Sequence, residues 1–77
     1  MEEELIKHIA KSLVANPDAV VVNVIDGEGS AVLELTVDEN DLGKVIGKHG
    51  RVAKAIRTIL QAANVKSGKH IALEILD

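Results

Sequence analysis

The sequence predicts an α+β domain in which three helices cover one face of a three-stranded mixed sheet. Three observations lead to this prediction. Apolar residues recur at intervals of three and four in three segments, as they do on one face of a helix. In other segments they alternate with polar residues or are mostly β-branched, as in strands. Glycine, proline and asparagine separate the segments, and the resulting order of elements is α-β-β-α-α-β.

Residues 2–15 form the first predicted helix. Their apolar side chains make one continuous stripe, and three glutamates at the start suit the positive end of the helix dipole. Pro17 forces Asn16 away from the helical region, so the helix stops there. Two strands follow, because residues 20–26 are β-branched and apolar and residues 31–37 alternate. The turn between them contains two glycines, which makes the pair an antiparallel hairpin.

The second half of the chain is predicted to contain two helices and a third strand. A short helix over residues 41–46 begins after polar residues that can cap it, and a longer helix runs over about 51–63. Residues 66–69 form a loop, and residues 70–76 alternate again. A helical crossover joins this last strand to the strand of residues 31–37, so the two strands should lie parallel and adjacent.

A glycine-flanked corner joins the two helices of the second half. Gly47 and Gly50 enclose Lys48 and His49, and Arg51 follows. N–H groups at the start of the second helix have no partner within it, and glycine lets an anion approach the main chain closely. The corner is therefore predicted to bind phosphate, whereas a mere helix–helix corner would need no basic pair. Since the corner should be exposed, aspartate at both glycines is expected to abolish binding without unfolding the chain.

The corner and the residues before it resemble the core motif of the KH domain, a module for single-stranded nucleic acid. In this chain the motif reads Val45-Ile46-Gly47-Lys48-His49-Gly50-Arg51. The resemblance covers nearly the whole chain and is close to the small bacterial KH proteins of the KhpA type, which also carry an Asn-Pro-Asp turn like that at 16–18. It implies a type II KH domain over 1–77, with an N-terminal helix and strand at 1–30 and the KH core at 31–76.

The predicted nucleic-acid groove lies beside the corner. Arg51, Lys54 and Arg57 recur at three-residue spacing and form a basic ridge along the longer helix. The resemblance places the groove between this side and the last strand, with hydrogen bonds to base edges from main chain near Ile71. An apolar floor is expected from Val45, Ile46, Val52 and Ile71. The predicted RNA-binding residues are Val45, Ile46, Gly47, Lys48, His49, Gly50, Arg51, Lys54, Arg57 and Ile71.

Charge is divided unequally between the two halves of the chain. Residues 1–41 carry ten acidic residues and two lysines, whereas residues 42–73 carry seven lysines or arginines and no acidic residue. Although the net charge is −3, this asymmetry indicates a surface for a polyanion beside the corner. Lys66 and Lys69, in the loop before the last strand, are equally consistent with nucleic-acid contact and with solvation of the loop.

Composition and motifs argue against an enzyme, a metal site and a cofactor. The chain has no cysteine and no recognisable nucleophile–base pair. The segment from Gly43 to His49 is one residue short of a P-loop, and His49 stands where serine or threonine would hold magnesium. Neither a membrane span nor a signal peptide is recognisable. We therefore expect a cytoplasmic protein with no membrane association and no small-molecule substrate.

Two functions from different classes are expected. The first is binding of single-stranded RNA over about four nucleotides, with DNA also possible. The resemblance implies a homodimer, or a heterodimer with a larger KH-containing protein of the Jag type. It also implies roles in RNA chaperoning or post-transcriptional regulation, with effects on cell shape and cell-wall biogenesis. The second is a protein-interaction or ribosome-associated adaptor, for which apolar surface is expected at Val21, Val32, Ala72 and Leu76.

Overall fold

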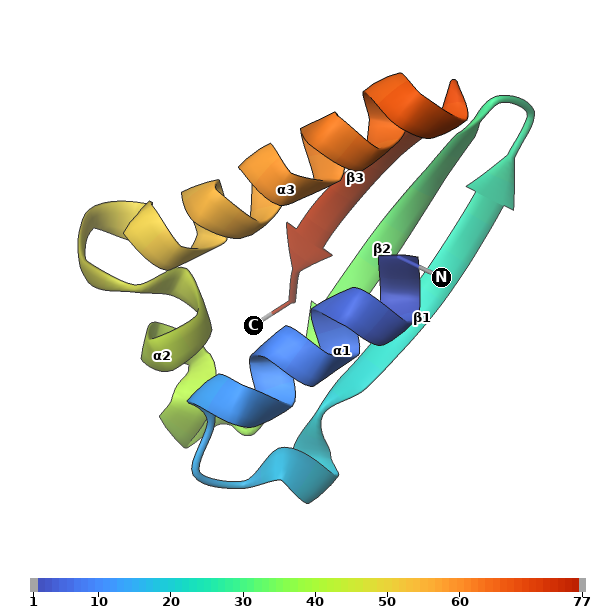
Figure 1. Cartoon of the computed structure of the whole chain (residues 1–77). Helices are drawn as coiled ribbons and strands as arrows, with labels where there is room; N and C mark the ends of the chain where they lie inside the picture. The colour runs from blue at the N-terminus through green and yellow to red at the C-terminus, as the bar shows by residue number, and fades with distance from the viewer. Residues whose placement is uncertain (1, 77) are drawn as a thin grey trace.

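The computed structural model describes residues 2–76, apart from the side chain of Ser67, and has the predicted order of elements (Figure 1). The helices are α1 (Glu2–Leu13), α2 (Leu42–Ile46) and α3 (Arg51–Ser67), and the strands are β1 (Val21–Gly27), β2 (Ser30–Thr36) and β3 (His70–Ile75). Single turns of 3₁₀-helix occupy Pro17–Ala19, Glu39–Asp41 and Lys48–Gly50. The α-β-β-α-α-β order predicted from the sequence is confirmed.

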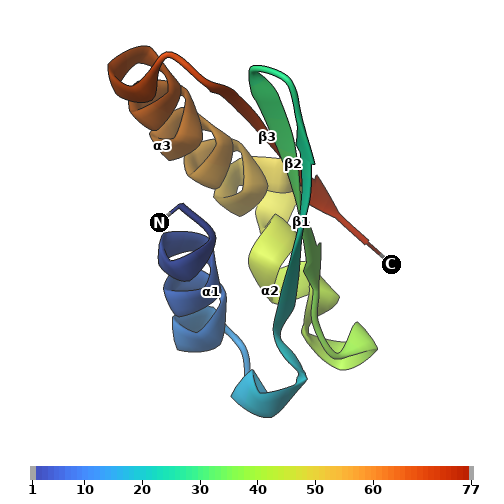
Figure 2. The same ribbon diagram turned by 90° about the vertical axis from the view of Figure 1, so that its right-hand side faces the viewer.

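The three strands form one sheet in the order β1-β2-β3. The β1–β2 pair is antiparallel, with Val24 opposite Leu33, and the β2–β3 pair is parallel, with Leu33 beside Leu73. All three helices lie on one face of this sheet, which Figure 2 shows from its edge. The predicted mixed sheet, and with it the type II KH fold, is confirmed.

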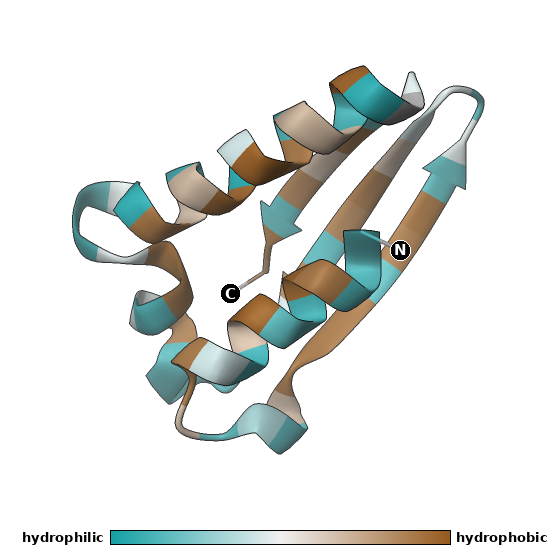
Figure 3. Cartoon of the chain, viewed as in Figure 1, coloured by the Kyte–Doolittle hydropathy of each residue, from teal (hydrophilic) through white to brown (hydrophobic). Residues whose placement is uncertain are grey.

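The core between the helices and the sheet is built from aliphatic side chains, because the chain has no aromatic residue. Figure 3 shows bands of hydrophobic residues along α1, α3 and the strands. In β2, every second residue from Ala31 faces the helices and is buried. The buried cluster consists of Ile6, Ala10, Val20, Ala31, Leu33, Leu35, Val37, Val45, Ile56, Leu60, Ile71 and Leu73.

Helix α3 continues four residues beyond its predicted end near residue 63. Asparagine is a poor helix former, and the prediction therefore ended the helix near Asn64. The helix instead ends at Gly68, which adopts the left-handed conformation (φ 74°) and donates its N–H to the carbonyl of Asn64 at 2.8 Å. This is the usual glycine ending of a helix. The extra turn carries Asn64 to a position beside β3.

Asp41 joins the end of α1 to the start of α2. Among the polar residues expected to cap the short helix, Asp38 caps the 3₁₀ turn that leads into it by accepting from the N–H of Asn40, whereas Asp41 makes no capping bond to α2. Its carboxylate, with only 2% of the residue exposed, accepts hydrogen bonds from the N–H groups of Ala15 (3.1 Å) and Asn16 (3.0 Å). Lys44 lies 3.2 Å from the same carboxylate. The pKa of Asp41 is held below its ordinary value, most of all by the hydrogen bond from Ala15 and then by the one from Asn16. Burial of the carboxylate acts in the opposite direction and raises the pKa. Asp41 thereby ties the end of α1 to the start of α2.

Candidate nucleic-acid interface

The corner between α2 and α3 has three residues with positive φ, at the end of the molecule away from the hairpin turn (Figure 1). Gly47 (φ 78°, ψ 170°) and Gly50 (φ 72°, ψ 15°) occupy conformations that favour glycine. His49, at φ 58° and ψ 25°, is left-handed as well, which the glycine spacing alone did not indicate. Histidine is one of the residue types enriched in this region.

Two main-chain donors in the corner have no acceptor in the part of the chain that the structure describes. Gly47 donates its N–H to Gly43 (2.8 Å) and Gly50 to Gly47 (3.1 Å), and Arg51 bonds back to Lys48. The N–H groups of Lys48 and His49 have no acceptor within residues 2–76. The two residues between the glycines therefore add donors to those predicted at the start of the longer helix. Both residues are exposed, as the prediction of an accessible corner requires.

The two glycines differ in their surroundings. A Cβ atom on Gly47 would lie 2.4 Å from Cγ2 and 2.8 Å from both Cβ and the backbone nitrogen of Val52. A Cβ atom on Gly50 would meet nothing within 4 Å. The expectation that aspartate at both glycines leaves the fold intact is therefore wrong at Gly47, which is packed against the first turn of α3. Substitutions that test binding belong at Lys48 and His49.

The basic ridge is exposed and carries no internal counter-charge. Arg51, Lys54 and Arg57 project from α3 into solvent, and none of them forms an ion pair within the described chain. Lys69, in contrast, binds Asp26 at 2.6 Å, so this lysine of the last loop has an acidic partner on β1. Uncompensated cations along one face attract a polyanion, and the ridge continues from the predicted phosphate corner along the helix.

The apolar floor differs from the sequence expectation. Val45 is fully buried, so its side chain belongs to the core and is removed from the expected floor. Ile46 and Val52 are half-buried beside the corner, and Ile71 keeps 8% of its surface exposed. Ile71 lies in a groove of about 170 Å³ between α3 and β3, which contains no other residue of the expected floor. The groove is lined by Arg57, Leu60, Gln61, Asn64, His70, Ile71, Ala72 and Leu73.

The outer edge of β3 forms one wall of this groove. His70 donates its N–H to Gly29 at 3.0 Å and Leu76 donates to Leu35 at 2.9 Å, both toward β2. Neighbouring residues of a strand in a parallel pair direct their main-chain groups to opposite sides, so those of Ile71 and Leu73 point to the open edge. Ile71 is already paired there, because Asn64 accepts from its N–H (2.9 Å) and donates to its carbonyl (3.1 Å). The predicted base-edge position at Ile71 is thus occupied by a side chain.

Sequence reasoning missed Gln61 and Asn64 as groove residues. They follow Arg57 at intervals of four and three residues, which places the three side chains on one flank of α3. This spacing was available from the sequence, but the predicted helix ended near Asn64. The structure thus brings Arg57 and Ile71 together at the groove, about 9 Å along the helix axis from Arg51 at 1.5 Å per residue.

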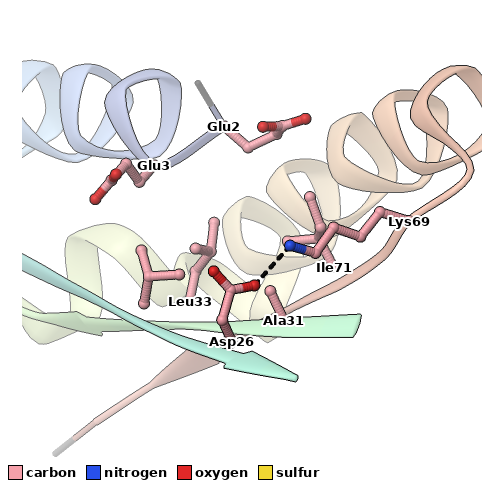
Figure 4. A pocket seen from close by; sticks show the side chains of 8 residues that line it. Glu2, Glu3, Asp26, Ala31, Leu33, Lys69 and Ile71 are labelled. Carbon is pink, nitrogen blue, oxygen red and sulfur yellow. Dashed lines mark hydrogen bonds and ion pairs between the residues drawn. The ribbon is translucent and has the colours of Figure 1, made fainter. Parts of the chain in front are cut away.

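A second pocket, of about 390 Å³, lies on the inner face of the sheet beside the start of α1 (Figure 4). Its floor is apolar and includes Val24 and Leu33, whereas Glu2, Glu3 and Asp26 supply acidic groups. Lys69 bonds to Asp26 over Ala31, the residue of β2 that is paired with Asp26 on one side and with Ile71 on the other. The small side chain of Ala31 leaves room for this ion pair. The excess of carboxylates disfavours a nucleic acid in this pocket.

Two further features of residues 2–76 concern membranes and metals. None of their helices has the length and hydrophobicity needed to cross a membrane. In the same part of the chain, no three histidine or acidic side chains are gathered where they could hold a metal ion.

Comparison with known proteins identifies close relatives over the whole fold. The family model described as "KhpA/KhpB, KH domain" matches residues 3–75. The RNA-binding protein KhpA of Borreliella burgdorferi is 54% identical over 76 residues, covering 99% of this chain and 93% of that protein. The RNA-binding protein KhpA of Caldanaerobacter subterraneus is 56% identical over 73 residues, covering 95% of this chain and 97% of that protein.

Solved structures show the same fold within a larger protein. A structure of Era in complex with MgGDPNP and nucleotides 1506-1542 of 16S ribosomal RNA superposes with a TM-score of 0.63 and 26% identity. The match covers 96% of this chain but 28% of that one, so the likeness concerns one part of Era. The extent of the family match and the identity to full-length relatives lead to one conclusion. The chain belongs to the KhpA/KhpB family of KH-domain proteins.

Proposed function

We propose that this chain binds single-stranded RNA and holds its sugar–phosphate backbone at the corner between α2 and α3. The observation that carries the proposal is the pair of N–H groups at the exposed residues Lys48 and His49, which have no acceptor among residues 2–76. Backbone donors of this kind, with cationic side chains beside them, favour phosphate. The relatives named RNA-binding protein KhpA and the Era structure with ribosomal RNA support RNA as the partner.

The strand is expected to run from the corner along α3. One phosphate accepts hydrogen bonds from the two N–H groups of the corner, and the next phosphates meet Arg51, Lys54 and Arg57 on the ridge. The bases then turn into the groove between α3 and β3, where the open main-chain groups of Leu73 supply a donor and an acceptor. The aliphatic lining of this groove provides apolar contact without aromatic stacking, and about four nucleotides are held. DNA fits the same description.

The direct test is a substitution of both residues between the glycines by aspartate, Lys48→Asp with His49→Asp. Aspartate tolerates the left-handed conformation that His49 adopts, so the fold should survive. The carboxylates place two negative charges against a phosphate, and we expect the affinity for a short single-stranded RNA to fall by a factor of about 100 or more. The matched control is Lys7→Asp with His8→Asp, the same residue pair on exposed surface of α1.

The two variants separate a local effect from a change in net charge. Both remove the same charges, so a general electrostatic effect would weaken RNA binding equally in both. The proposal requires a large loss in the corner variant and a small one in the α1 variant, measured by fluorescence anisotropy at several salt concentrations. RNA binding by the corner variant at unchanged affinity would refute the proposed function.

We further propose that the domain, with residues 31–76 as its KH core, acts in pairs in the cytoplasm. One groove that holds about four nucleotides binds weakly, and a second linked groove raises the overall affinity through effective concentration. The pair is a homodimer, or a heterodimer with a larger KH-containing protein of the Jag type. Its proposed role is RNA chaperoning or post-transcriptional regulation that influences cell shape and cell-wall biogenesis. Sedimentation of the chain with and without RNA tests the homodimer, and sedimentation of its mixture with the larger KH-containing protein tests the heterodimer. A strict monomer in all of these conditions contradicts the pairing.

The acidic pocket favours a second candidate function, that of a protein-interaction or ribosome-associated adaptor. An apolar floor with Val24 and Leu33 beneath Glu3 and Asp26 fits an aliphatic side chain on a basic protein segment. Such a segment is attracted by the half of the chain that carries ten acidic residues. If the adaptor function dominates, Val24→Lys abolishes association with the protein partner while RNA affinity stays unchanged. The corner variant then keeps its partner, which distinguishes the two functions.

A further inference from the structure

The side chain of Asn64 forms two hydrogen bonds to one residue of the free edge of β3. Its Oδ1 accepts from the N–H of Ile71 at 2.9 Å, and its Nδ2 donates to the carbonyl of Ile71 at 3.1 Å. Both bonds are partly buried, and the carbonyl of Asn64 itself accepts the N–H of Gly68 at the end of the helix. The carboxamide therefore links α3 to β3 at a fixed position.

This pairing closes one of the positions at which the edge could bind a base. A carboxamide presents an acceptor and a donor side by side, as a nucleobase does on its Watson–Crick edge. The main chain of Ile71 offers the complementary donor and acceptor, and Asn64 uses both of them. Leu73, two residues further along, directs its groups to the same edge, and no side chain within residues 2–76 bonds to them.

We infer that Asn64 takes the place of a base at Ile71, so that base recognition along β3 begins at Leu73. This inference rests on the proposed RNA binding and adds a residue that sets which nucleotide is read. Asn64 acts by position, because its side chain fills a site on the edge of β3. A base that displaced the carboxamide would form the same two hydrogen bonds to Ile71. The donor and the acceptor of Asn64 would then need other partners. The exchange yields no net hydrogen bond, so the side chain stays in place when RNA binds.

Amide hydrogen exchange on the unmodified protein tests the inference without any substitution. The N–H of Ile71 should exchange slowly both in the free protein and in the RNA complex, because Asn64 protects it in each. The N–H of Leu73 should exchange faster in the free protein and become protected when RNA binds. Equal RNA-induced changes at Ile71 and Leu73, together with release of the Asn64 carboxamide resonances, would overturn the inference.

The substitution Asn64→Ala opens the position at Ile71 and keeps a good helix former within α3. The variant should bind a five-nucleotide strand about three- to tenfold more tightly than the unmodified chain does, whereas its affinity for a four-nucleotide strand changes little. The matched control is Gln61→Ala, which removes a carboxamide from the same flank of α3 without opening β3. Its affinity should show no dependence on the fifth nucleotide.

The alternatives give different results in the same titrations. If Asn64 has a structural role only, Asn64→Ala lowers the affinity for strands of every length by the same factor, and the inference is wrong. If neither the variant nor the unmodified chain binds any strand, the proposed RNA binding fails, and the inference fails with it. A gain in the affinity of Asn64→Ala that appears only with the five-nucleotide strand supports both the proposed RNA binding and the inference about Asn64.

Discussion

Alanine at Gly47 and alanine at Gly50 should destabilise the protein to very different extents, although the two glycines flank the same corner. Both positions have positive φ, so an alanine is strained at each. At Gly50 the left-handed conformation costs about 1–2 kcal/mol, and the space around the new Cβ is open. At Gly47 the combination of φ 78° and ψ 170° lies in a region occupied almost only by glycine, which costs about 1–3 kcal/mol.

The contact with Val52 adds a second cost at Gly47. The new Cβ would lie 2.4 Å from a methyl group and 2.8 Å from the backbone nitrogen of Val52, so α3 itself must shift. Overpacking of this kind costs about 1–3 kcal/mol. The total for Gly47→Ala is about 4 kcal/mol, against about 1–2 kcal/mol for Gly50→Ala. A chain of 77 residues has a total stability of about 4–12 kcal/mol, so Gly47→Ala removes a large part of it.

Urea denaturation followed by circular dichroism measures both values under identical conditions. The expected difference in the free energy of unfolding between the variants is about 2–3 kcal/mol, with Gly47→Ala the less stable. Equal destabilisation of the two variants, within about 0.5 kcal/mol, would refute the reasoning, because the two sites would then differ in no energetically relevant contact.

Three further predictions concern the helix layer, the ridge and the core. Asp41→Asn should lower the midpoint of thermal unfolding at pH 7 by several degrees, because the N–H groups of Ala15 and Asn16 bond to different oxygens of Asp41 and asparagine replaces one of these oxygens by an NH₂ donor; an unchanged midpoint contradicts this role. The folded-state pKa of Asp41 lies below the unfolded value of about 3.9, so the stabilisation by its carboxylate is complete above pH ~5 and is lost as the pH falls through the folded pKa. The unfolding midpoints of Asp41→Asn and the unmodified protein should therefore converge in acid. Arg57→Gln should reduce the slope of log affinity against log salt for single-stranded RNA by about 1, and an unchanged slope would remove Arg57 from the ridge that contacts phosphate. Leu35→Ala should cost about 2–5 kcal/mol in urea denaturation, because Leu35 is fully buried between the sheet and the helices; a cost below about 1 kcal/mol would contradict that packing.

The fold could be predicted because the residues within each helix, strand and turn indicate the conformation of that segment. The alternation in residues 31–37, the proline after the first helix and the glycines of the hairpin turn each determine a nearby conformation. The parallel pairing of β2 and β3 followed from the helical crossover between them and is confirmed. The predicted end of α3 is too early. Asn64 is a poor helix former, but in the folded protein its side chain bonds to the main chain of Ile71 in β3, and a pattern within the helix does not report this contact.

The candidate site was predictable in part. The glycines and the basic residues identified the corner. Its exposure depends on how the rest of the chain packs around it, and the structure shows that Lys48 and His49 are exposed. The burial of Val45, the link between Asp41 and the end of α1, and the closure of Ile71 by Asn64 are tertiary contacts between segments. No periodicity within one segment reports such contacts. The sequence therefore indicates the phosphate site better than it indicates which bases the groove can read.

The most direct test of the central claim is an NMR titration of the ¹⁵N-labelled protein with a short single-stranded RNA. If main-chain donors hold the phosphate, the amide resonances of Lys48 and His49 should move downfield the most, followed by those of α3 near Arg51 and of β3 at Leu73. The resonances of α1 and β1 should stay nearly unchanged. Saturable shifts confined to residues 2–41, with Lys48 and His49 unaffected, would contradict the account.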